Sequence, residues 1–169
     1  VDEPFYAFYL SRSGIHHPGK EEVIKSQPIS EHEVSDALFS ITNKPVVFVK
    51  NMAHHLALMD QSFLEKVTNI FLIRSPKQII SSYAQVIEAP TLWDIGIEYQ
   101  YTLFNSLKQK GQVPVVLDSG LLLLDPPSIL KQACQHLDLP FEDNMLRCKP
   151  GPKAYDGVWA KYWYNNVHK

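Results

Sequence analysis

Long apolar runs, an excess of basic residues and closely spaced cysteines are all missing from this chain. No apolar run approaches the roughly 20 residues of a membrane-spanning helix, so a membrane protein is not expected. The net charge is −2 without a basic stripe, whereas nucleic-acid-binding proteins usually carry one. The cysteines, Cys134 and Cys148, lack metal-site spacing and are too few for a disulfide scaffold, which favours a reducing compartment such as the cytoplasm.

Apolar residues are plentiful by contrast, and they fall in short groups. With 169 residues and 45% hydrophobic content, the chain is predicted to form one domain, residues 1–169. Apolar runs at 45–50, 70–73 and 113–118 predict buried strands. Helices are expected over 20–26, 31–41, 55–67, 92–110, 127–137 and 155–168. This alternation predicts an α/β fold of three layers, a parallel sheet with helices on both faces, from which some strands are missing.

The most informative segment is 69–83, Asn-Ile-Phe-Leu-Ile-Arg-Ser-Pro-Lys-Gln-Ile-Ile-Ser-Ser-Tyr. Its apolar run ends in Arg74, and Ser75-Pro76 then predicts a helix start that leads to Ser82. Ligands bind at the carboxyl ends of strands in open α/β sheets, and an arginine fork suits a phosphate. We therefore interpret this unit as a phosphate site. The alternative is an arginine that is solvated or paired with a carboxylate.

Four segments between 45 and 161 resemble, in order, PAPS-dependent sulfotransferases, where PAPS is 3′-phosphoadenosine 5′-phosphosulfate. The segment 69–83 resembles their 3′-phosphate-binding segment, and Val-Phe-Val-Lys-Asn-Met-Ala-His-His resembles the strand that presents a lysine and a histidine. Val-Leu-Asp, Asp-Pro and Leu-Asp-Leu-Pro-Phe match a later stretch, and Gly-Pro-Lys with Asp-Gly-Val-Trp matches a late Gly-rich loop. The opening Asp-Glu-Pro-Phe-Tyr-Ala resembles a bacterial-type branch that includes relatives fused to aminotransferase-like proteins.

The resemblance implies the reaction and the nucleotide site. A sulfuryl group would pass from PAPS to a hydroxyl or amine acceptor of small-molecule size, leaving adenosine 3′,5′-bisphosphate, and no metal would be needed. Arg74 and Ser82 would hold the 3′-phosphate, and Lys153 would reach it from the late loop. Gly157 would allow the close backbone approach that this loop needs.

The resemblance also implies the catalytic residues. Lys50 would polarise the oxygen that bridges phosphate and sulfate, and a histidine would take the proton of the acceptor. His54 and His55 are both candidates, but consecutive residues do not share one helix face, so one of them is expected to point into the site. His54 is preferred because it is nearer to Lys50. Glu3 is an alternative base or acceptor contact.

One feature of these sulfotransferases has no counterpart in the chain. They begin with a strand and a loop, rich in Gly, Ser and Thr, that cradles the 5′-phosphosulfate. Gly14 and Gly19 are isolated and lack a flanking strand and helix, so they do not form such a loop. We therefore expect an amino-terminally incomplete domain that lacks the first strand and loop and is inactive by itself.

Other patterns have simpler interpretations. An aromatic cluster near the start is expected in the core rather than in an acceptor pocket; it comprises Phe5, Tyr6, Phe8 and Tyr9. The pairs at 16–17 and 54–55 are the adjacent histidines of the chain, but they lack the full ligand set of a zinc site. Two other functions are considered: a non-catalytic sulfotransferase-like binding module, and a nucleotide kinase of the related P-loop class.

Overall fold

The structure, a computed structural model, describes residues 1–147, 149–165 and 167. Its α-helices and strands are α1 (Tyr6–Ser13), α2 (Lys20–Ser26), α3 (Glu31–Phe39), β1 (Ile70–Ile73), α4 (Pro76–Tyr83), α5 (Leu92–Ile95), α6 (Ile97–Gln109), β2 (Val115–Asp118), α7 (Ser119–Leu124), α8 (Pro126–His136) and α9 (Ala160–Trp163). Three 3₁₀ turns, η1 (Ala53–Leu56), η2 (Ser62–Lys66) and η3 (Asp143–Leu146), complete it. Cys148 lies outside the described residues, as does the end of the helix expected over 155–168.

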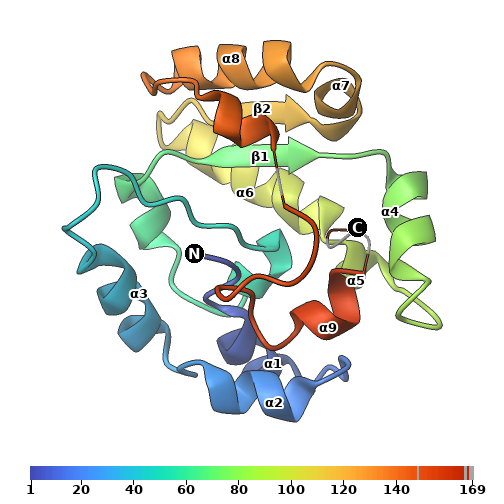
Figure 1. Ribbon diagram of the computed structural model, residues 1–169. Coiled ribbons are helices and arrows are strands. Elements are labelled where there is room, and N and C mark those ends of the chain that lie inside the picture. The colour runs from blue at the N-terminus through green and yellow to red at the C-terminus, as the bar shows by residue number, and fades with distance from the viewer. Residues whose placement is uncertain (148, 166, 168–169) are drawn as a thin grey trace.

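The strands β1 and β2 form a parallel pair, with Ile70 opposite Val115 and Ile73 opposite Asp118. Figure 1 shows this pair near the top, with α7 and α8 on the side of β2 and helices α1, α2 and α3 at the opposite end of the molecule. Both strands end on the side where α4 lies (Figure 1). The α/β class and the parallel pairing expected from the sequence are therefore confirmed.

Several helices begin close to the residues that the sequence predicts, because the residues there cap the helix or favour its first turn. Helix α4 begins with Pro76 in its first turn, as Ser75-Pro76 predicts. The Ser30 side chain accepts a hydrogen bond from the Glu33 N–H at the start of α3, and Asp125 accepts one from the Ser128 N–H at the start of α8. Within the described part of the chain, none of the helices has the length and apolar character needed to cross a membrane.

Three expected helices are wrong in extent. The helix over 92–110 is interrupted at Gly96, whose φ of 66° ends α5 before α6 begins. The segment 55–67 lies in the 3₁₀ turns η1 and η2 and their connection, and the described residues of 155–168 contain the short α9 and no other helix. Tyr155, the first residue of that expected helix, is exposed.

The strand expected over 45–50 is also wrong. In the structure only Lys50 is paired, in an isolated parallel bridge with Asp2. Val46 and Phe48 are 52% and 66% exposed, although their sequence context predicts burial. A strand depends on a hydrogen-bonded neighbour. In Figure 1 this segment lies on the side of β1 away from β2, and among the described residues the sheet contains β1 and β2 alone.

The core consists of two clusters of buried residues. Every residue from Phe5 to Leu10 is buried, so the first part of α1 is enclosed instead of showing one apolar stripe, whereas Ser11 and Arg12 near its end are exposed. Phe5 contributes to a cluster with β1 and α6, whereas Tyr6 and Tyr9 belong to a second cluster with α2 and Trp159. The expectation that the early aromatic residues are core is confirmed.

We expect Gly96→Ala to destabilise the fold more than Gly111→Ala. Both glycines have positive φ, 66° and 83°, where an L-residue costs about 1–2 kcal/mol. A Cβ at Gly96 would also lie 2.6 Å from Nδ1 of the buried His54, whereas nothing lies within 4 Å of a Cβ at Gly111. Overpacking of this kind adds about 1–3 kcal/mol. Urea unfolding measures both variants, and equal losses would show that His54 does not lie against Gly96.

Candidate functional site

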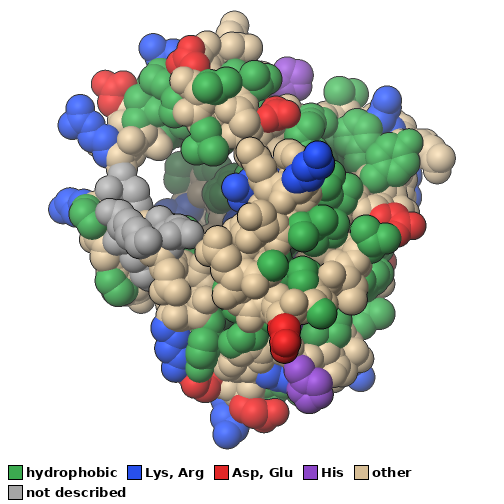
Figure 2. Space-filling model, turned by 90° about the vertical axis from the view of Figure 1, so that its right-hand side faces the viewer, with side chains coloured by type: hydrophobic (Ala, Val, Ile, Leu, Met, Phe, Trp, Pro, Cys, Tyr) green, Lys and Arg blue, Asp and Glu red, His purple; other side chains and the backbone are tan. Residues whose placement is uncertain are grey.

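The phosphate-binding candidates lie where β1 meets α4. Arg74 follows β1 directly and is exposed, and its Nε donates to Oε1 of Gln78, 3.4 Å away. Ser82 is exposed on the last turn of α4. Figure 2 views the molecule from the α4 side and shows a hollow in this face with Lys or Arg atoms inside it and at its rim. No carboxylate of the described residues pairs with Arg74, so the guanidinium remains accessible to an anion.

Lys50 is held by the first residues of the chain. Its backbone N–H donates to the Val1 carbonyl at 2.9 Å, and its carbonyl accepts from the Glu3 N–H at 2.7 Å. Its ammonium is paired with Oε1 of Glu3 and lies 3.7 Å from Oδ1 of Asp2. Burial opposes the charged form of Lys50, but the Glu3 carboxylate, together with Tyr164 and Asp2, outweighs burial and raises the pKa of Lys50. Lys50 is therefore a fixed positive charge whose side chain is still partly exposed.

Glu3 is buried, with 6% of its surface exposed, and its φ of 42° is unusual for a residue with a side chain. Its backbone is held by Lys50, and its carbonyl also accepts from Nε2 of Gln27 at 3.1 Å. Burial raises the pKa of Glu3 despite the opposing effect of the Lys50 ammonium. Backbone strain that is held by surrounding contacts is concentrated at functional sites. The sequence suggested Glu3 only as an alternative, because its contact with Lys50 spans 47 residues.

Both candidate histidines are fully buried in η1. His55 stacks between the rings of Tyr6 and Tyr9, with centroids 4.7 Å away on each side. Its Nδ1 lies 3.7 Å from Oε2 of Glu3, and the ring has no hydrogen-bond partner at Nδ1. His54 points instead toward Gly96. The structure thus brings His55, rather than the preferred His54, next to the Lys50–Glu3 pair.

Burial keeps both imidazoles neutral near pH 7. It lowers the pKa of His54 to about 4, and it lowers the pKa of His55 well below its ordinary range. A neutral imidazole can accept a proton, which is the chemistry expected of a base. The two buried rings have no exposed edge for an acceptor, however, whereas the Glu3 carboxylate lies between His55 and the partly exposed Lys50.

The late loop folds around its own lysine. Nζ of Lys153 donates to the carbonyls of Gly151, at 2.7 Å, and Lys149, and its backbone N–H donates to Oδ2 of Asp156 at 2.7 Å. A Cβ at Gly157 would lie 2.1 Å from the ring of Trp159, which is buried in the core. The close packing of Trp159 is therefore a sufficient reason for a glycine at position 157. The structure does not bring Lys153 into contact with Arg74 or Ser82.

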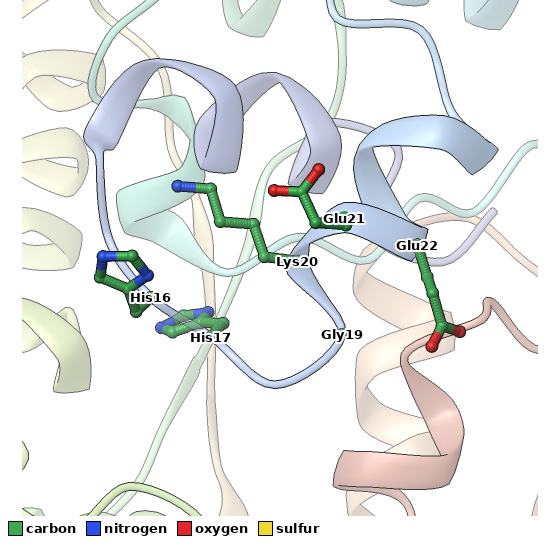
Figure 3. Close-up of a pocket in the computed structure, with 6 residues that line it drawn as sticks. All are labelled: His16, His17, Gly19, Lys20, Glu21 and Glu22. Carbon is green, nitrogen blue, oxygen red and sulfur yellow. The ribbon is translucent and has the colours of Figure 1, made fainter.

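A second hollow, of about 340 Å³, lies at the loop before α2. Figure 3 shows its lining: His16, His17, Gly19, Lys20, Glu21 and Glu22. Glu22 is already engaged, because its carboxylate accepts from Nζ of Lys161 at 2.6 Å and from the Tyr162 hydroxyl at 3.0 Å. In the described part of the chain, no group of three or more His, Cys, Asp or Glu residues is placed to hold a metal ion.

Comparison with known proteins gives one family and two relatives. The family model described as "Sulfotransferase domain" matches residues 1–169. The chain is 32% identical to branched-chain-amino-acid aminotransferase-like protein 1 of Arabidopsis thaliana, over 100% of this chain and 31% of that protein. It is 30% identical to branched-chain-amino-acid aminotransferase-like protein 2 of Arabidopsis thaliana, over 100% of this chain and 30% of that protein. The chain thus spans under a third of these relatives, and no solved structure matches significantly.

We expect the fold to lose stability as the pH falls below about 6.5, the ordinary histidine value. A histidine whose pKa is lowered by folding binds its proton more readily in the unfolded state, so acid favours unfolding. With a folded pKa of about 4, His54 alone accounts for about 2 kcal/mol of unfolding free energy between pH 7 and pH 5. Urea unfolding at the two pH values measures this loss.

His54→Gln serves as the test of that assignment and His32→Gln as its control. Between pH 7 and pH 5, the unfolding free energy of His54→Gln should fall by about 2 kcal/mol less than that of the parent. The second changes an exposed histidine and should leave the pH dependence as it is in the parent. The raised pKa of Glu3 acts in the opposite direction, but it is common to all three proteins. An unchanged pH dependence in His54→Gln would contradict a buried neutral imidazole.

Proposed function

This chain belongs to the sulfotransferase domain family, whose model covers residues 1–169, and on that premise we propose that it transfers a sulfuryl group from PAPS to a hydroxyl or amine of a small molecule. Adenosine 3′,5′-bisphosphate is the leaving product. The observation that carries the proposal is the Lys50 ammonium, which is paired with the buried Glu3 carboxylate beside His55. A cation and a proton acceptor are the two groups that this transfer needs.

In this proposal the 3′-phosphate binds at the start of α4. The Arg74 guanidinium supplies paired charge-assisted hydrogen bonds, and the Ser82 hydroxyl supplies a further one. The amino-terminal end of α4 adds the favourable field of a helix terminus. Lys153 joins the site by exchanging the carbonyls of its own loop for phosphate oxygens, and Gly157 keeps the backbone of that loop close to Trp159.

The chemical step forms one bond to sulfur and breaks another. The acceptor oxygen or nitrogen attacks the sulfur atom, the bond from sulfur to the bridging phosphate oxygen breaks, and the acceptor proton passes to a base. Lys50 stabilises the negative charge that develops on the bridging oxygen. For this it turns from Glu3 toward the donor, which frees the carboxylate while the acceptor loses its proton.

Among the candidate bases, Glu3 and His55 form the better supported pair. Glu3 touches Lys50, and Nδ1 of His55 lies 3.7 Å from the second oxygen of the same carboxylate. Burial raises the pKa of Glu3 and lowers that of His55, so the carboxylate gains proton affinity while the imidazole loses it. Glu3 would receive the acceptor proton and His55 would share it, whereas His54 would support the ring of Tyr9.

The proposal extends to the fold of the whole protein. Leu72 and Ile73 on β1 and Phe48 on the opposite segment leave apolar surface exposed beside the unpaired edge of β1. A further strand at this edge would cover that surface and complete the three-layer, P-loop type of sheet. The same strand would bring the loop that holds the 5′-phosphosulfate, from the part of the protein outside residues 1–169. Residues 1–169 would then be most of one cytoplasmic sulfotransferase domain.

We expect Arg74→Ala to weaken binding of adenosine 3′,5′-bisphosphate by about 1.5–3 kcal/mol, as charged hydrogen bonds are lost. Calorimetric titration of the full-length protein measures this change. Lys108→Ala, which removes an exposed cation of α6, is the control for net charge and should bind as the parent does. A folded parent that does not bind the bisphosphate would refute the nucleotide assignment.

Lys50→Met in the full-length protein should lower kcat by about 10²–10³-fold, because the leaving oxygen loses its cation. Binding of adenosine 3′,5′-bisphosphate, which has no sulfuryl group, should change little. Transfer from PAPS to a panel of phenols, alcohols and amines supplies the measurement, with Lys44→Met as a control in the same segment. Nucleotide binding without any transfer that depends on Lys50 would instead favour a non-catalytic binding module.

A further inference from the structure

The helix that carries Ser82 is weakly buried but firmly held at one residue. None of the side chains of α4 is buried. At its last position, however, the Tyr83 hydroxyl makes a hydrogen bond with Nε2 of His17, 3.1 Å away. The Tyr83 ring also packs on Trp163 of α9, with centroids 5.3 Å apart. These two contacts join the carboxyl-terminal end of α4 to the loop before α2 and to α9.

His17 is held from both sides, so the attachment continues into the core. Its Nδ1 makes a second hydrogen bond with the Tyr6 hydroxyl at 2.9 Å. A neutral imidazole has one donor and one acceptor nitrogen, so one tyrosine donates to the ring and the other accepts from it. Burial lowers the pKa of His17, which keeps this neutral arrangement near pH 7. Tyr6 is itself buried in α1.

The same tyrosine in α1 contacts the catalytic group. The rings of Tyr6 and His55 are stacked with an interplanar angle of 6°, and His55 lies beside the Glu3 carboxylate that pairs with Lys50. A continuous series of contacts thus connects Tyr83 with Lys50. One end of it lies next to Ser82 on the proposed phosphate helix, and the other end is the proposed catalytic cation.

We propose that Tyr83 is a positioning residue, which acts through His17 and Tyr6 to set α4 relative to the Lys50 group. The inference rests on the proposed function, because the 3′-phosphate and the sulfuryl group belong to one donor molecule. Catalytic groups must be held within about 0.5 Å of their working positions. A helix with no buried side chain needs such an attachment, and Tyr83 provides it at the residue after Ser82.

Tyr83→Phe is the sharpest test, because it keeps the ring on Trp163 and removes only the hydroxyl. Tyr101→Phe is the control, since Tyr101 is 68% exposed on α6. Amide hydrogen exchange in the full-length protein should become about 2–12-fold faster in α4 of the Tyr83 variant, the range for one lost hydrogen bond. Exchange of α6 amides that open independently of α4 should stay close to that of the parent, and the free energy of unfolding should fall by no more than this one hydrogen bond accounts for.

Nucleotide binding then distinguishes a positioning role of Tyr83 from a general effect on stability. Tyr83→Phe should weaken adenosine 3′,5′-bisphosphate about 2–12-fold. Adenosine 5′-monophosphate, which lacks the 3′-phosphate, should bind the variant and the parent alike. When Arg74 is already alanine, Tyr83→Phe should cause a smaller loss of affinity for the bisphosphate, because the effects of residues that act through one site are not additive.

The outcomes distinguish this inference from the proposed function. If the parent binds the bisphosphate and Tyr83→Phe binds it equally well, the positioning role is refuted and the sulfotransferase proposal stands. Unchanged exchange in α4 refutes the positioning role as well. If the folded parent does not bind the bisphosphate at all, the proposed function fails first and the inference fails with it. Faster exchange in α4 with a loss specific to the 3′-phosphate supports both.

Discussion

The enclosure of α1 by the rest of the molecule is the constraint on which the site depends. Phe5 to Leu10 are all buried, and the tyrosines among them surround His55 and reach His17. Aromatic walls exclude water, and charges interact more strongly where water is excluded. The Glu3–Lys50 pair and the neutral imidazoles are consequences of this one environment. Any change that lets water reach α1 would act on the ion pair and the imidazoles together.

The site therefore consists of two parts with different characters. The part at the end of β1 is open, and its Arg74 is exposed at the surface. The part around Glu3 is closed, strained at φ 42° and fixed by backbone hydrogen bonds to Lys50. An open, cationic surface suits binding of a mobile anion, while a closed and rigid group suits the chemical step. The proposed donor, which carries its recognition phosphate and its reactive group at separate positions, would use both parts.

The sequence predicts the parts of the structure that depend on near neighbours. The β1–α4 unit follows from an apolar run and Ser75-Pro76, and both act within a few residues. The strand over 45–50 could not be judged in this way, because its formation depends on a partner strand elsewhere. Helix α1 was missed because every residue from Tyr6 to Leu10 is buried, which removes the periodic pattern from its first turns. The pairing of Glu3 with Lys50 and His55 joins residues about fifty positions apart, and no local pattern encodes that distance.

The unpaired edge of β1 has a practical consequence for work on these 169 residues alone. Among the described residues no strand pairs with this edge, although the Leu72 carbonyl accepts a hydrogen bond from Nε2 of Gln100. An open edge next to exposed apolar side chains such as Leu72 and Ile73 can pair with another extended chain. Two copies of residues 1–169 could pair at this edge. We therefore expect self-association that grows with concentration, and a charged residue placed at the edge would oppose it.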